Sequence, residues 1–193
     1  NGADDTTTVQ YDPLCRKIRT DQPLGAYKTW AYLDYGTPGL QRILETEPSD
    51  RGTDIISTDR RFDGFGRTNR TRVNGFVCDF TLYNARGQIR KQNSPSYDCS
   101  DSWTTGTETF FDALDRPIRV VKPNNTVITT MYAYHRWKYI IDEDSKWRAQ
   151  LEDGYGRVIA KAHLLDGAWR YSNYSYDALG RLTQVTDPAS NLW

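Results

Sequence analysis

The sequence predicts an all-β protein built from antiparallel β-hairpin repeats. The first observation is composition: Leu, Ile, Val and Phe make up only 37 of 193 residues, whereas 13 Tyr, 6 Trp and 21 Thr favour strands. The second is a turn motif that recurs along the whole chain. The third is another turn signal at a fixed distance after that motif, which leaves strand-length segments between turns. Together they predict ordered, aromatic-rich strands with a thin aliphatic core.

Charge and hydropathy exclude two classes of partner. The 25 Lys and Arg residues balance 25 Asp and Glu residues, whereas nucleic-acid binding needs a basic surplus gathered on one face. No stretch approaches the roughly 18 consecutive apolar residues of a membrane span. The first five residues lack the basic and apolar regions of a signal peptide, so we expect a processed protein or a fragment of a longer one.

The recurring motif is an aromatic residue, then Asp or Asn, two further residues, a turn residue, and Arg. Six copies are recognisable, two of them with one change each. They lie at Tyr11, Asp12 and Arg16; at Phe62, Asp63, Gly66 and Arg67; at Tyr83, Asn84 and Gly87; at Phe111, Asp112 and Arg116; at Asp153, Gly156 and Arg157; and at Tyr176, Asp177, Gly180 and Arg181. The third copy has Gln88 in place of Arg, and the fifth lacks the aromatic residue.

Each copy predicts the tip of a β-hairpin. Asp or Asn caps a turn with its own side chain, and Gly in four of the six copies suits the left-handed residue that follows a type I turn. Asp115 is a tolerable substitute for Gly there, while Cys15 is a costly one. We therefore expect a type I turn with a bulge at every copy.

A second turn signal follows the Asp or Asn by eleven residues. It is a proline in four copies, at Pro23, Pro95, Pro123 and Pro188. The intervening six or seven residues make strands of roughly 20 Å, at ~3.3 Å per residue. Degenerate copies are expected near 32–36 and 134–138. With them, residues 1–193 form a single repeat region of about eight hairpin units, with mixed strand faces that suit a large curved sheet.

Three cysteines leave at least one thiol unpaired. Cys78 and Cys99 are candidates for a disulfide, and three separate thiols, with Cys15, are the alternative. Three cysteines are too few to fix the redox compartment. Asn-x-Ser/Thr sequons at Asn69, Asn124 and Asn173 matter only if the source organism glycosylates.

Two further side-chain patterns allow alternative interpretations. The Arg after each turn is expected to pair with the Asp of the same or the neighbouring hairpin, and plain solvated charges are the alternative. The tryptophans replace missing aliphatic core, or else they form a carbohydrate-binding surface; the core is favoured. These tryptophans are Trp30, Trp103, Trp137, Trp147 and Trp169.

No pattern indicates catalysis. His135 and His163 lie apart from any metal-ligand pattern, and neither a nucleophilic Ser motif nor a phosphate-binding loop occurs. The acidic run at 142–145 favours a solvated turn over a cation-binding loop. We therefore predict no catalytic residue, no cofactor and no metal, and the recurring Asp residues are explained by turns.

The motif resembles the YD repeats of the RHS family. The segment Tyr-Asp-Ala-Leu-Gly-Arg-Leu-Thr-Gln-Val-Thr-Asp-Pro at 176–188 is similar to that repeat from end to end, and weaker copies extend the resemblance over the chain. The family includes the cage-forming B and C subunits of bacterial Tc toxins, polymorphic toxins, and teneurins. In these proteins the repeats form a β-sheet that spirals into a hollow shell.

The resemblance implies an exported, non-enzymatic protein, secreted or at the cell surface. The expected fold is a segment of a spiralling RHS β-shell, and the expected partners are the rest of a longer RHS-type chain and an enclosed polypeptide cargo. The alternative is an adhesion or carbohydrate-binding module that contacts a cell-surface glycan or receptor. A glycan-acting enzyme has the least support.

Overall fold

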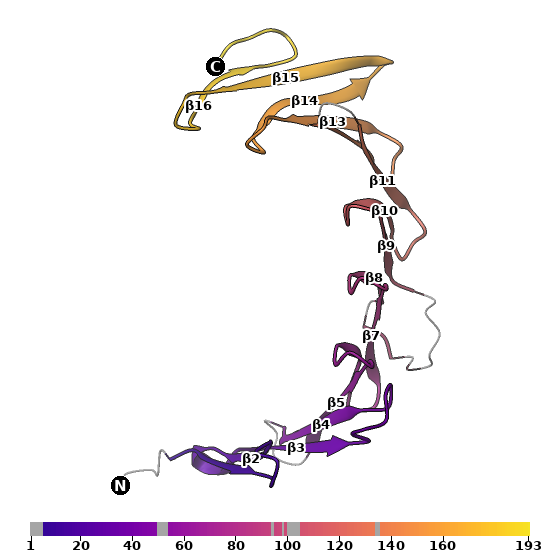
Figure 1. Cartoon of the computed structure of the whole chain (residues 1–193), viewed down its shortest axis with the longest axis vertical. Coiled ribbons are helices and arrows are strands. Elements are labelled where there is room, and N and C mark those ends of the chain that lie inside the picture. Colours follow the sequence, from indigo (N-terminus) through magenta and orange to yellow (C-terminus); the bar gives the residue numbers. More distant parts are fainter. Residues whose placement is uncertain (1–5, 50–53, 94, 98, 100–104, 134–135) are drawn as a thin grey trace. The chain divides into compact units, whose positions relative to one another are not determined.

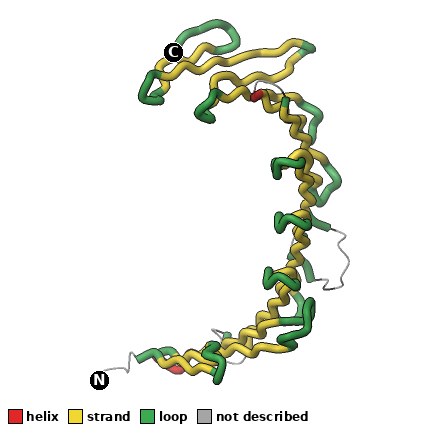
Figure 2. Tube along the Cα trace, in the orientation of Figure 1, coloured by secondary structure: helices red, strands yellow, loops and turns green. Residues whose placement is uncertain are grey.

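The computed structural model describes residues 6–49, 54–93, 95–97, 99, 105–133 and 136–193. The chain divides into two compact units, Asn1–Thr107 and Glu108–Trp193. Apart from the 3-10 turn η1 (Pro23–Gly25) and a 3-10 residue at Arg136, every element among these residues is a strand (Figure 2). The predicted all-β fold of antiparallel hairpins is confirmed. Among the described residues, no helix has the length and apolar character needed to cross a bilayer.

In the first unit, eight strands form an antiparallel meander in which each strand pairs with the next along the chain (Figure 1). The strands are β1 (Thr8–Tyr11), β2 (Lys17–Asp21), β3 (Tyr27–Leu33), β4 (Arg42–Pro48), β5 (Ile55–Phe62), β6 (Thr68–Val73), β7 (Val77–Tyr83) and β8 (Ile89–Gln92).

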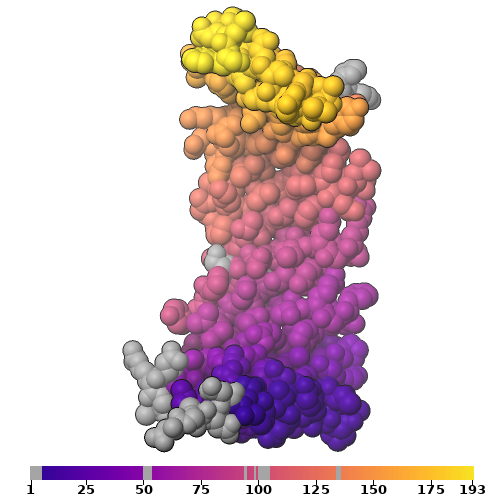
Figure 3. Space-filling model, turned by 90° about the vertical axis from the view of Figure 1, so that its left-hand side faces the viewer, coloured from indigo at the N-terminus to yellow at the C-terminus, as the bar shows by residue number. Residues whose placement is uncertain are grey.

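The second unit repeats this arrangement, again with each strand beside its sequence neighbour. Its strands are β9 (Thr107–Phe111), β10 (Pro117–Val121), β11 (Val127–Tyr132), β12 (Trp137–Ile141), β13 (Trp147–Glu152), β14 (Val158–Leu165), β15 (Ala168–Tyr176) and β16 (Leu182–Thr186). Within each unit the strands follow one another in chain order without interleaving, as the colour bands of Figure 3 show. Each sheet also twists, so it curves rather than lying flat (Figure 1).

The turns of each unit alternate between two rims of its sheet. We call the rim that carries the motif turns the YD rim; its turns join each odd-numbered strand to the next even-numbered one. The expected degenerate copies fall where β3 connects to β4 and where β11 connects to β12. Tyr134 and His135, in the second of these, lie outside the described residues. The proline turns lie on the opposite rim.

The apolar core is thin, as the composition predicts. Only five apolar side chains are buried among the described residues: Cys78, Phe80, Ala149, Ala160 and Ala162. One layer of sheet leaves both faces with mixed polar and apolar side chains. Stability must therefore come mainly from contacts between neighbouring strands.

An aromatic cluster supplies much of the apolar packing in the second unit. Tyr139, Ala149, Ala162 and Tyr171 are register partners across β12, β13, β14 and β15. The Tyr139 and Trp169 ring centroids lie 5.9 Å apart although two strands separate β12 from β15. The rings reach toward each other above the two small alanines.

The same cluster includes Trp137, whose ring centroid lies 6.3 Å from that of Tyr171. Trp137 and Trp169 are half-buried in this packing, as the core interpretation expects. Trp30 lies under the ammonium of Lys17, at 4.2 Å. Trp103 lies outside the described residues.

A disulfide joins Cys78 of β7 to Cys99, with their Cα atoms 5.4 Å apart. Cys78 is fully buried, while Cys15 is a free, exposed thiol. The backbones of Cys78 and Ser96 exchange two hydrogen bonds, and Arg70 Nη2 donates to the Cys99 carbonyl at 2.6 Å. The segment after β8 is thereby fastened to the edge of β7.

Candidate functional site: the YD rim

Each motif turn is closed by one carboxylate. In the first copy, Asp12 Oδ1 accepts hydrogen bonds from the backbone N–H groups of Leu14 and Arg16, both at 2.9 Å. Asp12 Oδ2 accepts from Arg16 Nε and Nη2, both at 2.7 Å. Cys15 takes the left-handed conformation, with φ of 59°. One side chain thus satisfies two backbone donors and binds the Arg fork through two of its N–H groups.

Four other copies repeat this geometry. The distances from Arg Nη2 or Nε to Asp Oδ2 lie between 2.6 and 2.8 Å. The pairs are Asp63–Arg67, Asp112–Arg116, Asp153–Arg157 and Asp177–Arg181. Each Arg therefore binds the Asp of its own hairpin, one of the two pairings that the sequence left open.

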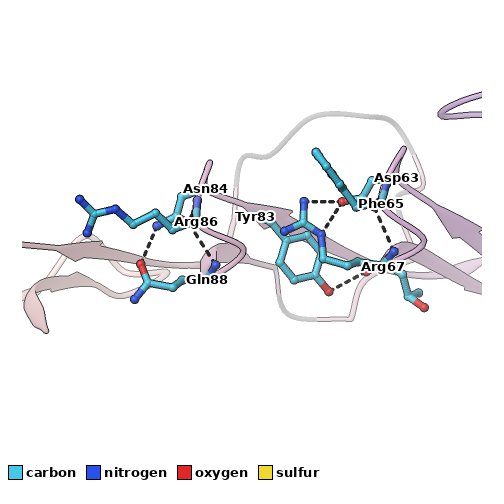
Figure 4. Close-up of polar contacts among 8 residues, drawn as sticks. Asp63, Phe65, Arg67, Tyr83, Asn84, Arg86 and Gln88 are labelled. Carbon is cyan, nitrogen blue, oxygen red and sulfur yellow. Dashed lines mark hydrogen bonds and ion pairs between the residues drawn. The ribbon is translucent and has the colours of Figure 1, made fainter. Parts of the chain in front are cut away.

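The remaining copy uses amides instead of charges (Figure 4). Asn84 Oδ1 accepts from the backbone N–H groups of Arg86 and Gln88, and Asn84 Nδ2 donates to Gln88 Oε1 at 2.8 Å. The replacement of Arg by Gln is thus matched by the replacement of Asp by Asn. The two changes conserve the turn and remove both charges.

Four of the arginines also connect their hairpin to the next one, a contact that the sequence did not reveal. Arg16 lies 4.4 Å from the ring centroid of Tyr32, at the end of the next hairpin's first strand. The Tyr32 hydroxyl donates to the carbonyl of Lys17, the residue after that Arg, at 3.0 Å. The tyrosine of one hairpin therefore covers the arginine of the preceding one and hydrogen-bonds its strand.

This link occurs four times, twice in each unit. Arg67, Arg116 and Arg157 lie 4.3, 4.0 and 4.9 Å from the ring centroids of their tyrosines. Those tyrosine hydroxyls donate to Thr68, Pro117 and Val158 carbonyls at 2.9, 3.3 and 2.9 Å. Figure 4 shows the link between Arg67 and Tyr83. The tyrosines that complete the four links are Tyr32, Tyr83, Tyr132 and Tyr176.

The residue at the aromatic position of the motif depends on the turn that precedes it. All four tyrosines come after a turn with a complete Asp–Arg pair. Phe111 comes after the uncharged Asn84–Gln88 turn, Phe62 after the longer β3–β4 connection, and Glu152 takes the place after the β11–β12 connection. The spacing could have revealed the link, because three of the four tyrosines lie sixteen residues after their arginine.

The following turn also packs against the arginine. Gly87 is left-handed, with φ of 85°, and a Cβ atom built on it would lie 3.1 Å from Arg67 Nη1. Arg67 thus contacts its own Asp, the next tyrosine and the next turn. A hydroxyl or methyl group added at that glycine would crowd the guanidinium.

The rim hydrogen bonds lower the pKa values of its carboxyls. For Asp112 the largest cause is the Arg116 side chain, followed by the Arg116 backbone N–H, and the pKa falls below its usual value. For Asp63 partial burial is the largest single influence and opposes the shift, but the Arg67 side-chain and backbone bonds outweigh it and lower the pKa. These carboxylates stay ionised and bound to Arg at neutral pH, which leaves them unsuited to general acid or base catalysis.

The opposite rim contains two turns of the same construction. Asp142 Oδ1 accepts from the N–H groups of Asp144 and Lys146, and Asp187 Oδ1 accepts from Ala189 and Asn191. The 142–145 run is therefore a capped turn, the interpretation that the sequence favoured. Within the described part of the chain, no group of His, Cys, Asp and Glu side chains is arranged to hold a metal ion.

The third residue of the YD turns projects from the rim. Its large apolar side chain is between 71 and 88% exposed in five turns. These tip residues are Leu14, Phe65, Leu114, Tyr155 and Leu179. The YD rim thus presents one apolar group at each of these turns above a row of charged pairs.

A meander of hairpins with the same turn geometry, in which four pairs of described neighbours share the same Arg–Tyr link, defines a β-sheet repeat protein. Residues 153–191 match the RHS Repeat family, which confirms the resemblance seen in the sequence for that segment. The match includes the Asp153 and Asp177 turns and the link from Arg157 to Tyr176.

Two solved structures share the fold. One is the crystal structure of TcdB2-TccC3 without its hypervariable C-terminal region, which aligns with 87% of this chain at 16% identity and a TM-score of 0.52. The other, a Tc holotoxin pore of Photorhabdus luminescens, aligns with 90% at 15% identity and a TM-score of 0.52. The chain spans about a tenth of the length of each, 10% in both cases. No curated protein matches its sequence.

Proposed function

We propose that this chain forms part of the wall of a hollow RHS β-shell that encloses or shields a polypeptide cargo in an exported protein. The observation that carries the proposal is the link from arginine to tyrosine on the YD rim. Among the described residues it fastens four pairs of neighbouring hairpins with a ring contact and a hydrogen bond, so a sheet of this kind extends by adding hairpins. The fold shared with the Tc structures supports the same function.

The partners under this proposal are the rest of a longer RHS-type chain and the cargo that it encloses. The disulfide between Cys78 and Cys99 supports export, because such bonds persist in oxidising compartments. Each rim Asp among the motif copies is bound to its Arg, which supports a mechanical role over an enzymatic one.

The test uses the product of the full gene that encodes this chain. Electron microscopy is expected to show a hollow particle, and limited proteolysis is expected to spare an enclosed segment until the particle is unfolded. A solid particle without a lumen, or an equally rapid cleavage of all segments in the native protein, would overturn the proposal.

The alternative, a carbohydrate-binding or adhesion module, lacks a specific observation in its favour. Trp137 and Trp169 are half-buried in the aromatic cluster and do not form an open stacking platform. Binding of the 193-residue chain to defined glycans on an array would reverse this ranking.

A further inference from the structure

The last turn of the chain repeats the geometry of an internal one. After Arg116, β10 leads to a turn at 122–126. β11 then pairs with β10, and Val127 lies opposite Val121. After Arg181, β16 leads to a turn at 187–191, and Thr186 pairs with Leu192. Asn125 and Ser190 occupy matching left-handed positions, with φ of 64° and 68°. The two segments therefore follow the same path.

Leu192 and Trp193 already behave as the first residues of another strand. The backbones of Val185 and Trp193 exchange two hydrogen bonds, at 3.0 and 2.9 Å. This is the register in which Val120 faces Ile128 in the internal hairpin. Beyond Trp193, the edge of β16 continues along Gln184, Thr183 and Leu182 toward the YD rim.

Arg181 has one of its two usual contacts. Its ion pair with Asp177 is complete at 2.7 Å. Among the described residues it stacks on no ring, and its side chain is 75% exposed, whereas the four arginines covered by a tyrosine are 30 to 42% exposed. The higher exposed fraction of the Arg181 side chain shows that, in the described part of the chain, its guanidinium lacks the tyrosine ring that covers the other four.

We propose that one further antiparallel strand docks on the edge of β16. This strand continues from Leu192 and Trp193, and the fourth residue after Trp193 is a tyrosine. That residue lies sixteen positions after Arg181, the spacing of Arg16–Tyr32, Arg67–Tyr83 and Arg116–Tyr132. Its ring covers the Arg181 guanidinium, and its hydroxyl donates to the Leu182 carbonyl as Tyr132 donates to Pro117. The inference rests on the proposed wall function and names the chemistry of the next wall element.

Tyrosine is required because the two contacts come from different parts of the side chain. The ring face attracts the guanidinium, and a phenylalanine would supply that part alone. The hydroxyl reaches the neighbouring strand's carbonyl, and only tyrosine combines the two. Where the preceding turn lacks a complete Asp–Arg pair, the chain itself has Phe62, Phe111 or Glu152 in place of tyrosine.

The test extends the 193-residue chain by four residues, Thr-Thr-Met-Tyr, which copy Thr129–Tyr132. A matched extension ends in Phe, and both are also made with the substitution Arg181→Gln. Hydrogen exchange of the β16 amides reports on docking of the added strand. A second readout is the NMR chemical shift of the Arg181 Nε–H group, which a ring stacked on it changes.

We expect the Tyr-ended extension to slow exchange of the β16 amides about five- to tenfold more than the Phe-ended one, and to shift the Arg181 signal. Arg181→Gln is expected to lower the protection given by both extensions, because it removes the guanidinium that either ring would cover. Equal protection by the two extensions, or protection that Arg181→Gln leaves unchanged in both, would overturn the inference. A full-length particle without a lumen would refute the wall function and leave this result standing, so the two failures are distinguishable.

Discussion

Tyr83→Phe is the sharpest test of the link between repeats, because it removes one atom from one link. The Tyr83 hydroxyl donates to the Thr68 carbonyl at 2.9 Å in a partly buried site. Its loss leaves that carbonyl without this donor, and a hydrogen bond of this kind contributes about 1 kcal/mol net. Tyr83→Leu also removes the ring that lies 4.3 Å from Arg67, which raises the expected loss to about 2 kcal/mol.

Tyr11 provides a matched control within the same chain. It occupies the same motif position, but it is 60% exposed and, among the described residues, takes no part in a link of this kind. Tyr11→Phe is therefore expected to change the free energy of unfolding by less than about 0.5 kcal/mol. Both variants are measured by urea unfolding, and Tyr83→Phe is expected to lower the melting temperature by about 2–4 °C for a chain of this size.

The comparison of the two tyrosines decides the outcome. If Tyr83→Phe and Tyr11→Phe have equal effects, the hydroxyl makes no contribution beyond a surface group, and the reasoning about links is wrong. If Tyr83→Leu costs no more than Tyr83→Phe, the ring contact with Arg67 contributes nothing.

Further predictions concern the turns, the disulfide and acid. Reduction of the Cys78–Cys99 disulfide opens a loop with a separation of 21 residues and is expected to lower the free energy of unfolding by about 3 kcal/mol. Urea unfolding with and without reductant measures this loss. An unchanged free energy would mean that the loop is already ordered without the disulfide. Cys15→Gly relieves a left-handed non-glycine residue and is expected to stabilise by about 1 kcal/mol, whereas Gly87→Ala is expected to cost at least as much; calorimetry that gives both the same sign would contradict this. The pKa of Asp112 is lowered in the folded state, so its stabilising effect is present above the usual value of 3.8 and is lost as pH falls through the lowered pKa. Asp112→Asn is therefore expected to flatten the acid limb of a curve of unfolding free energy against pH. An unchanged acid limb would show that the pairing with Arg116 does not stabilise the fold.

The turns were the predictable part of the fold. Asp followed by Gly and Arg has a local meaning, because the capping bonds and the left-handed residue all lie within five residues. The hairpins and the all-β class follow from the repetition of that local signal. Turns that lack it, such as the one that Asp142 caps, were harder to recognise as members of the series.

The links between repeats were less visible because they depend on register. Which tyrosine covers which arginine is decided by the lengths of two strands and a turn, and the longer interval from Arg157 to Tyr176 breaks the common spacing. In the copy at Asn84, the sequence shows only Gln88 in place of Arg as a change, because Asp and Asn are accepted alike at the turn. Only the geometry shows that Asn84 and Gln88 form one uncharged copy of the Asp–Arg pair.

The pairing of strands with their sequence neighbours within each unit has a kinetic consequence. Each β-hairpin closes a short loop, so the entropy lost before the first contacts form is small compared with that of a Greek-key sheet of equal size. Folding can start at any hairpin and spread to its neighbours in both directions. During synthesis the order is set by the ribosome, and each hairpin can join the sheet soon after its second strand emerges.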